Sequence, residues 1–328
     1  MSKNISKFLL ITVCFALFVV TLGAYTRLTD AGLGCPDWPG CYGHMVLPSK
    51  GKSLVEAQNA YPAIPIEQEK AWVEMAHRYA VGFLSILILF IACYALRAIK
   101  RKQPFPRVLP FVLIGLLAFQ AALGMWTVTL KLLPVVVMGH LLGGLTILSS
   151  LWWCYLSLKK PSSSPQDQLF KPWVILGGII VFCQIALGGW VSANYAGISC
   201  VGFPSCNGKL IPELDMQKAF NVKAPVGNNY QGGLLESTPR ITIQFVHRIG
   251  AMITFSYILL LSLTMIIRGS RTLKILAGIS LTLVMIQFAL GVINVVRLLP
   301  LSIAVAHNGF AAMLLLSVLA LIYHVRGK

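Results

Sequence analysis

Apolar residues along this chain gather into eight long blocks that are separated by polar segments. Each block is nearly free of charge, and most approach the roughly 20 residues that a helix needs to cross a bilayer core. Flanking residues such as 72–78 and 241–248 extend the blocks that look short. We therefore expect an all-α membrane protein with eight transmembrane helices. The blocks are 8–24, 79–96, 108–130, 134–158, 172–191, 249–267, 275–296 and 299–323.

The composition supports this interpretation. Hydrophobic residues make up 57% of the 328 residues and charged residues only 11%, with a mean hydropathy of +0.77. A soluble domain of this size would carry about a quarter charged residues. The first block resembles a signal peptide, but no small-residue cleavage site follows it, so we expect a retained helix.

The net charge of +17 would suit a nucleic-acid-binding protein, but its distribution argues against one. If the N-terminus is cytoplasmic, more than half of the 27 basic residues fall in short cytoplasmic segments. Asp167 is the only acidic residue there. This pattern predicts that both termini are cytoplasmic and that the basic residues orient the helices in a lipid bilayer.

Self-comparison shows that the sequence contains a repeat. "EMAHRYAVGF" at 74–83 matches "QFVHRIGAMI" at 244–253. "QAALGMWTVTLKLLPVVVMGH" at 120–140 matches "QFALGVINVVRLLPLSIAVAH" at 287–307, with Gln and His 20 residues apart in both. Repeats of four helices return the chain to the same side of the membrane, so we expect two tandem, pseudo-symmetric four-helix bundles.

The repeat also sets the expected domain boundaries. The N-terminal unit covers 1–158, a polar cytoplasmic linker covers 159–171, and the C-terminal unit covers 172–328. Each unit has one long outer loop, at 25–71 and at 193–239.

Four of the six histidines, His77, His140, His247 and His307, recur in the repeat. Each is expected within about two turns of the outer membrane face. Two histidines at matched depth on neighbouring helices can supply both axial ligands of a haem. The alternatives are hydrogen-bonded core histidines or a zinc site, and no third ligand recurs for zinc. Glycines expected to leave room for a macrocycle are Gly82, Gly139, Gly143, Gly144, Gly250 and Gly309.

The two units differ beside the histidines. Glu74 lies three residues before His77, on the same helical face, whereas Gln244 takes its place in the second unit. The N-terminal unit is therefore predicted to be chemically active and the C-terminal unit a plainer haem holder. The alternative for Glu74 is an exposed carboxylate at a helix start. The outer loops differ as well, with Arg27, Asp30 and Asp37 in the first and Ser192, Tyr195 and Gly202 at the matching places.

Arg78 and Arg248 directly follow two of these histidines. Two interpretations stay open for them. They pair with haem propionates, or they are interfacial anchors whose charged ends reach toward water.

These motifs, with "GAYTRLTDAGLGCPDWPGCYG", closely resemble the haem A synthases over nearly the whole chain. The resemblance implies oxidation of the C8 methyl group of haem O to a formyl group, with water as oxygen source, giving haem A for terminal oxidases. It implies that His77 and His140 flank haem O and act with Glu74 as catalytic residues. It further implies that His247 and His307 ligate the iron of a haem b.

The cysteines fit a subgroup of that family with a pair in each long loop. The resemblance implies disulfides Cys35–Cys41 and Cys200–Cys206, each closing a small loop above a haem site. Other members lack these pairs, so they cannot drive catalysis across the family. For Cys35–Cys41, a structural clip and an exchange with thiols both stay open.

Partners and location follow from the same comparison. We expect a bacterial inner-membrane protein with haem sites near the outer face, because no Arg- and Ser-rich extension precedes the first helix. Haem O would come from the haem O synthase. The electron acceptor stays unidentified without a flavin or nicotinamide fingerprint, and a homo-oligomer is compatible with the sequence. The alternatives are a di-haem cytochrome b that only transfers electrons, which would not need Glu74, and a transporter.

Overall fold

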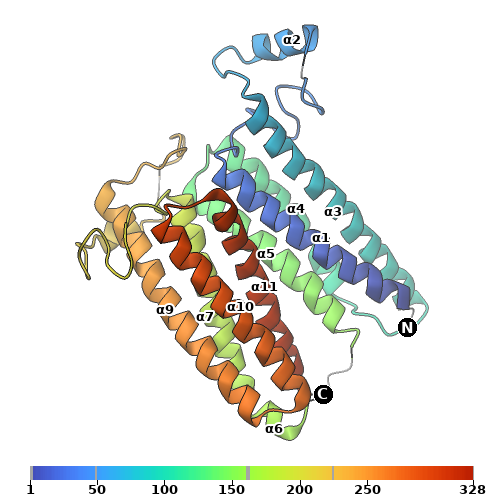
Figure 1. Ribbon diagram of the computed structural model, residues 1–328. Helices are drawn as coiled ribbons and strands as arrows, with labels where there is room; N and C mark the ends of the chain where they lie inside the picture. Colours follow the sequence, from blue (N-terminus) through green and yellow to red (C-terminus); the bar gives the residue numbers. More distant parts are fainter. Residues whose placement is uncertain (1–2, 49, 160–162, 224, 328) are drawn as a thin grey trace.

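The computed structural model describes residues 3–48, 50–159, 163–223 and 225–327 of the protein, and helices dominate it (Figure 1). Eight helices in this part of the chain are long and apolar enough to cross a membrane, which confirms the predicted number. Linker residues 160–162 lie outside the described residues. The eight helices are α1 (Lys3–Leu28), α3 (Gln68–Lys100), α4 (Leu109–Thr129), α5 (Pro134–Leu156), α7 (Lys171–Ala193), α9 (Ser237–Arg268), α10 (Arg271–Val296) and α11 (Leu301–Val325).

Several helices extend beyond the apolar blocks that predicted them. Helices α3 and α9 begin well before their apolar blocks, because amphipathic turns precede the lipid-spanning part of each helix. The long loops are therefore shorter than predicted and cover 29–67 and 194–236. Three short helices complete the fold: α2 (Lys52–Ala60) and α8 (Met216–Ala219) in the long loops and α6 (Pro165–Gln168) in the linker.

Each group of four long helices forms a ring. Helix α1 packs against α3 and α5, and α4 also packs against α3 and α5, so α3 and α5 occupy opposite corners. The second ring has the same order, with α9 and α11 at opposite corners between α7 and α10. The two rings are consistent with the predicted tandem repeat.

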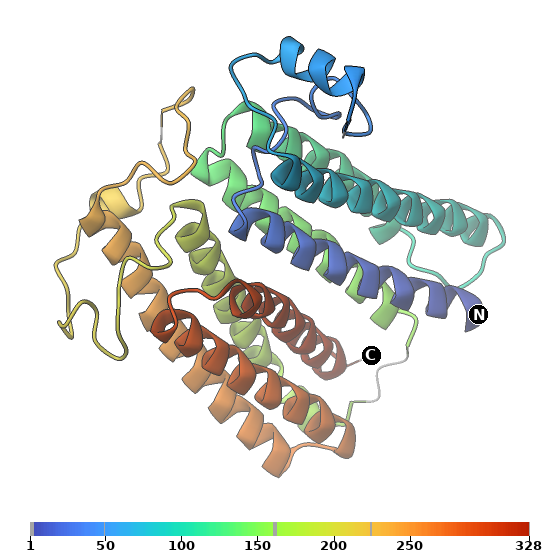
Figure 2. The same ribbon diagram turned by 45° about the horizontal axis from the view of Figure 1, so that its top comes forward.

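The two bundles meet along α1 and α5 on one side and α7 and α11 on the other, as Figures 1 and 2 both show. Buried apolar side chains such as Leu9, Leu148 and Leu321 belong to one core that extends through both bundles. Trp152 Nε1 donates a hydrogen bond to the Leu316 carbonyl across this junction at 2.9 Å. Large apolar side chains such as Phe83 are exposed on the outside, as contact with lipid tails requires.

Both long loops lie at one end of the molecule, and both described ends of the chain lie at the other (Figure 1). At that second end Asp167 of α6 is fully buried. Its carboxylate accepts hydrogen bonds from the Ser270 backbone N–H at 2.9 Å and lies 3.1 Å from Nε2 of His324. Burial alone would raise the pKa of Asp167, but the hydrogen bonds from Ser270, His324 and Ser164 outweigh it and lower the pKa to about 2. His324, predicted as a helix-end residue, therefore ties α11 to the linker.

Candidate functional site

The four repeated histidines form two pairs, one in each bundle. His77 on α3 and His140 on α5 come from opposite corners of the first ring, and His247 on α9 and His307 on α11 from opposite corners of the second. The prediction of neighbouring helices is therefore wrong, because α4 and α1 lie between α3 and α5, and α7 and α10 lie between α9 and α11.

A glycine on a third or fourth helix faces each imidazole ring. A Cβ atom added at any of these glycines would lie 3.0–3.2 Å from Cε1 of the ring, which is tighter than nearly all real Cβ contacts. Each glycine follows a leucine, so the recurring Leu-Gly dipeptide is a sequence signal to which the prediction gave no role. The pairs are Gly23 with His77, Gly124 with His140, Gly188 with His247, and Gly291 with His307.

Partly buried glutamines contact three of the four histidines. Gln120 Nε2 donates to the His140 carbonyl at 2.5 Å. Gln184 Nε2 lies 3.1 Å from both Nδ1 and the carbonyl oxygen of His247. Gln287 Nε2 lies 3.2 Å from Nε2 of His307. The sequence had indicated the Gln-to-His spacing but no role for it, and it had not indicated Gln184.

Two of the glycines that were predicted to make room for a macrocycle make room for these amides instead. A Cβ atom at Gly143 would collide with Oε1 of Gln120, and one at Gly250 would collide with Oε1 of Gln184. A Cβ atom at Gly82 would meet nothing. The glycines that shape the histidine sites are therefore largely a different set.

The donor set fits a haem in each bundle. Nδ1 of His77, of His140 and of His307 is buried without a hydrogen-bond partner among the described residues. Imidazoles from two helices of an apolar bundle are suitable axial ligands for a haem iron. Across the described residues, no group of three or more His, Cys, Asp or Glu side chains could hold a metal ion, in line with the argument against zinc.

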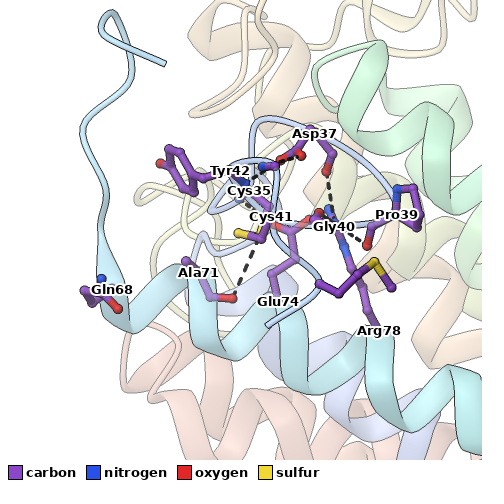
Figure 3. The surroundings of a disulfide bond; sticks show 12 residues. Cys35, Asp37, Pro39, Gly40, Cys41, Tyr42, Gln68, Ala71, Glu74 and Arg78 are labelled. Atoms are coloured by element: carbon purple, nitrogen blue, oxygen red, sulfur yellow. Dashed lines mark hydrogen bonds and ion pairs between the residues drawn. A yellow bond between two sulfur atoms is a disulfide. The ribbon is translucent and has the colours of Figure 1, made fainter. Parts of the chain in front are cut away.

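Above the first pair, residues 32–43 form a loop that we call the first lid (Figure 3). Cys35 and Cys41 form the predicted disulfide, and both are fully buried. Glu74 on α3 is only 5% exposed, and its Oε2 accepts a hydrogen bond from the Cys35 backbone N–H at 2.8 Å. Its Oε1 accepts one from Nη2 of Arg78 at 2.5 Å. Glu74 is therefore not an exposed carboxylate at a helix start, because it binds the lid.

Arg78 extends this network into the lid (Figure 3). Its Nη1 donates to the carbonyls of Asp37 at 2.9 Å, Pro39 at 3.2 Å and Gly40. The first lid also lies directly on α3, since a Cβ atom at Gly34 would come within 2.6 Å of the Lys70 backbone. Only glycine allows the loop to approach the helix this closely.

The Asp37 carboxylate shapes the first lid itself. It accepts hydrogen bonds from the backbone N–H groups of Tyr42 at 2.6 Å and Gly43 at 2.8 Å. Cys41 and His44 exchange backbone hydrogen bonds next to it, and His44 is a loop residue as predicted. Asp37 therefore holds a turn.

Residues 197–208 form the second lid, above the other pair. The predicted disulfide joins Cys200 and Cys206, and Arg248 donates to the carbonyls of Gly202 at 2.9 Å, of Ser205 at 3.1 Å and of Cys200. Gln244, in the place of Glu74, keeps a buried Oε1 without a partner among the described residues. Both arginines thus hold lid carbonyls, and a contact with haem propionates stays a prediction.

Arg27 lies at the junction of the bundles. Its Nη2 donates to the Ser192 carbonyl at 2.5 Å, and its guanidinium lies 3.9 Å from the centre of the Tyr195 ring. Its Nη1 is 3.4 Å from Asp30. The polar residues that differ between the two repeats thus contact one another across the bundles.

Comparison with known proteins agrees with this geometry. A protein of Shewanella oneidensis named haem A synthase is 44% identical over 321 residues, which cover 97% of this chain and 96% of the relative. Proteins with the same name from Granulibacter bethesdensis and Shouchella clausii are 29% and 26% identical, covering 96% and 89% of this chain and 86% and 87% of their own. The sequence model of the family COX15-CtaA, described as cytochrome oxidase assembly protein, matches residues 6–319. The chain therefore belongs to this family, the haem A synthases.

Proposed function

We propose that this protein is a haem A synthase, which oxidises the C8 methyl group of haem O to a formyl group and so provides haem A for terminal oxidases. One observation carries the proposal beyond family membership. Matching bundles each contain one histidine pair, and among the described residues the buried Glu74 lies three positions before His77, where the second bundle has the buried Gln244 before His247. A chain that served electron transfer alone would not need this difference.

The two units divide the work. In the N-terminal unit, residues 1–158, His77 and His140 hold the substrate haem O. In the C-terminal unit, residues 172–328, His247 and His307 hold haem b, which supplies one-electron redox chemistry. Support for this division comes from Gln244, which cannot take up a proton as Glu74 can.

The reaction defines what the residues of the first site must do. A methyl group and one water give a formyl group, four protons and four electrons. The electrons pass to an acceptor outside the chain. Glu74 takes up protons at its carboxylate oxygens as water adds to the methyl carbon. The Cys35 N–H and Arg78 orient that carboxylate, and the first lid covers it, so access of water to the site is limited.

The Cys35–Cys41 disulfide acts as a structural clip of the first lid. The complete burial of both cysteines supports this role over exchange with external thiols, because a thiolate must reach a sulfur atom to attack it. The clip keeps the Cys35 N–H fixed above Glu74.

The membrane arrangement follows from the charge pattern and the fold. The chain spans a bacterial inner membrane with both termini in the cytoplasm and both lids outside, so the haem sites lie near the outer face. The position of both described chain ends opposite the lids supports this (Figure 1). The haem O synthase delivers the substrate.

The proposal is tested by expressing the protein in cells that make haem O and by chromatography of the extracted pigments. Haem A is expected with the wild type, and a Glu74→Ala variant should keep haem b and form no haem A. Two haems b with no haem A would instead identify a di-haem cytochrome b, the second candidate.

A further inference from the structure

A five-residue motif distinguishes one histidine from the other three. "QAALG" at 120–124, "QIALG" at 184–188 and "QFALG" at 287–291 each end in a glycine that faces an imidazole ring. Each begins with a glutamine that contacts the same histidine, at the backbone carbonyl of His140, at Nδ1 of His247 and at Nε2 of His307. At 19–23 the fourth copy reads "VVTLG" and keeps the glycine but has Val19 in place of the glutamine.

The exception concerns His77. In the C-terminal bundle Gln184 lies 3.1 Å from Nδ1 of His247, and Gly250 leaves room for its amide. In the N-terminal bundle the corresponding residues are Val19 and Ala80, which both pack in the apolar core. Nδ1 of His77 is buried without a partner among the described residues. The glutamine and the glycine that accommodates it are thus replaced together.

The contact matters for an iron ligand. When Nε2 of a histidine binds a metal, Nδ1 carries a proton, and an acceptor for that proton fixes the ring and raises its basicity. A half-turn of the Gln184 amide lets Oε1 accept from Nδ1–H of His247, in exchange for the contact of Nε2 with the His247 carbonyl. Among the described residues, Nδ1 of His77, of His140 and of His307 has no partner, so His247 is the one repeated histidine of this part of the chain with a side-chain amide at Nδ1.

We propose that Gln184 is a positioning residue that retains the haem of the C-terminal bundle, and that Val19 in its place leaves the His77 ring free so that the N-terminal bundle can release its haem. This inference rests on the proposed function, in which one haem stays and the other is exchanged as substrate and product. The same fold thus holds one haem firmly and the other loosely through one side chain.

The test measures haem transfer from the purified full-length protein, loaded with haem O and haem b, to an excess of apomyoglobin. Gln184→Val should speed the loss of haem b by about tenfold or more, as removal of a hydrogen-bond partner from a metal-bound histidine usually does. It should also raise the midpoint potential of haem b. A less basic imidazole donates less electron density to the iron and therefore stabilises the ferric state less. Val19→Gln combined with Ala80→Gly should slow the loss of haem O.

Gly250→Ala gives a milder variant, because its Cβ atom would displace the Gln184 amide, and it should also speed haem b loss. Gly278→Ala is the matched control, since a Cβ atom there would meet nothing, and it should behave as the wild type. Transfer of haem b from Gln184→Val and Gly250→Ala within twofold of the wild type would overturn the proposal. Failure of the wild type to make haem A would instead contradict the proposed reaction, so the two can fail separately.

Discussion

The Glu74 carboxylate holds the first lid closed over α3, and replacing it with an amide should loosen that lid. In Glu74→Gln one of the two carboxylate oxygens is replaced by an amide NH2 group, which cannot accept a hydrogen bond. Either the contact with the Cys35 N–H or the contact with Arg78 is therefore lost. Hydrogen bonds to charged groups contribute about 1.5–3 kcal/mol and neutral ones about 0.5–1.5 kcal/mol. The closed lid should therefore lose about 1–2 kcal/mol of stability relative to the open lid.

Reduction of the Cys35–Cys41 disulfide reports on this change. Both sulfur atoms are buried, so a reductant reaches them only when the first lid opens. A loss of about 1–2 kcal/mol raises the open population about 5- to 30-fold, and the reduction rate should rise by the same factor. The assay is timed reduction with dithiothreitol, alkylation of the free thiols, and mass spectrometry of the peptides.

The second disulfide provides an internal control. Cys200–Cys206 is also buried, but its lid is held by Arg248 without a carboxylate. Its reduction rate should not change in Glu74→Gln. Equal reduction rates of Cys35–Cys41 in the variant and the wild type, within twofold, would refute the reasoning, and a rise for both disulfides would indicate general destabilisation.

Three further changes test other parts of the structure. Gly34→Ala places a Cβ atom 2.6 Å from the backbone of α3 and should speed reduction of the Cys35–Cys41 disulfide, at a cost of about 1–3 kcal/mol to the first lid. Because the pKa of Asp167 is lowered from 3.8 to about 2, its contribution to stability is complete above pH 3.8 and is lost as the pH falls toward 2. The melting temperature of the wild type should fall across this range, and that of Asp167→Asn should be lower at neutral pH and change less. Arg27→Lys removes the planar contact with Tyr195 and should lower the melting temperature of the protein, whereas Tyr195→Phe, which keeps the ring, should not.

Much of the fold could be predicted from the sequence because it is recorded in local patterns. Each span is a continuous apolar block, the repeat matched His77 with His247 and His140 with His307, and the expected depth in the membrane paired the histidines within each unit. Hydropathy could not give the helix ends near the lids, since α3 and α9 continue through amphipathic turns.

The contacts of the site could not be predicted in the same way, because they join residues far apart along the chain through backbone groups. Glu74 binds the N–H of a residue 39 positions earlier, and Asp167 meets His324 across 157 positions. Hydropathy and repeat spacing do not record the path of a loop. Gln184 was missed for another reason, because its repeat-equivalent Val19 differs, and a search for matching residues passes over a residue that occurs in only one copy.

The allocation of the two haems is tested most directly by chromatography of the haems that single histidine variants retain, purified from cells supplied with haem O. We expect His247→Ala and His307→Ala to lose haem b and still bind haem O. We expect His77→Ala and His140→Ala to keep haem b and form no haem A. A His77→Ala or His140→Ala variant that loses haem b and still forms haem A would contradict this allocation of the two haems.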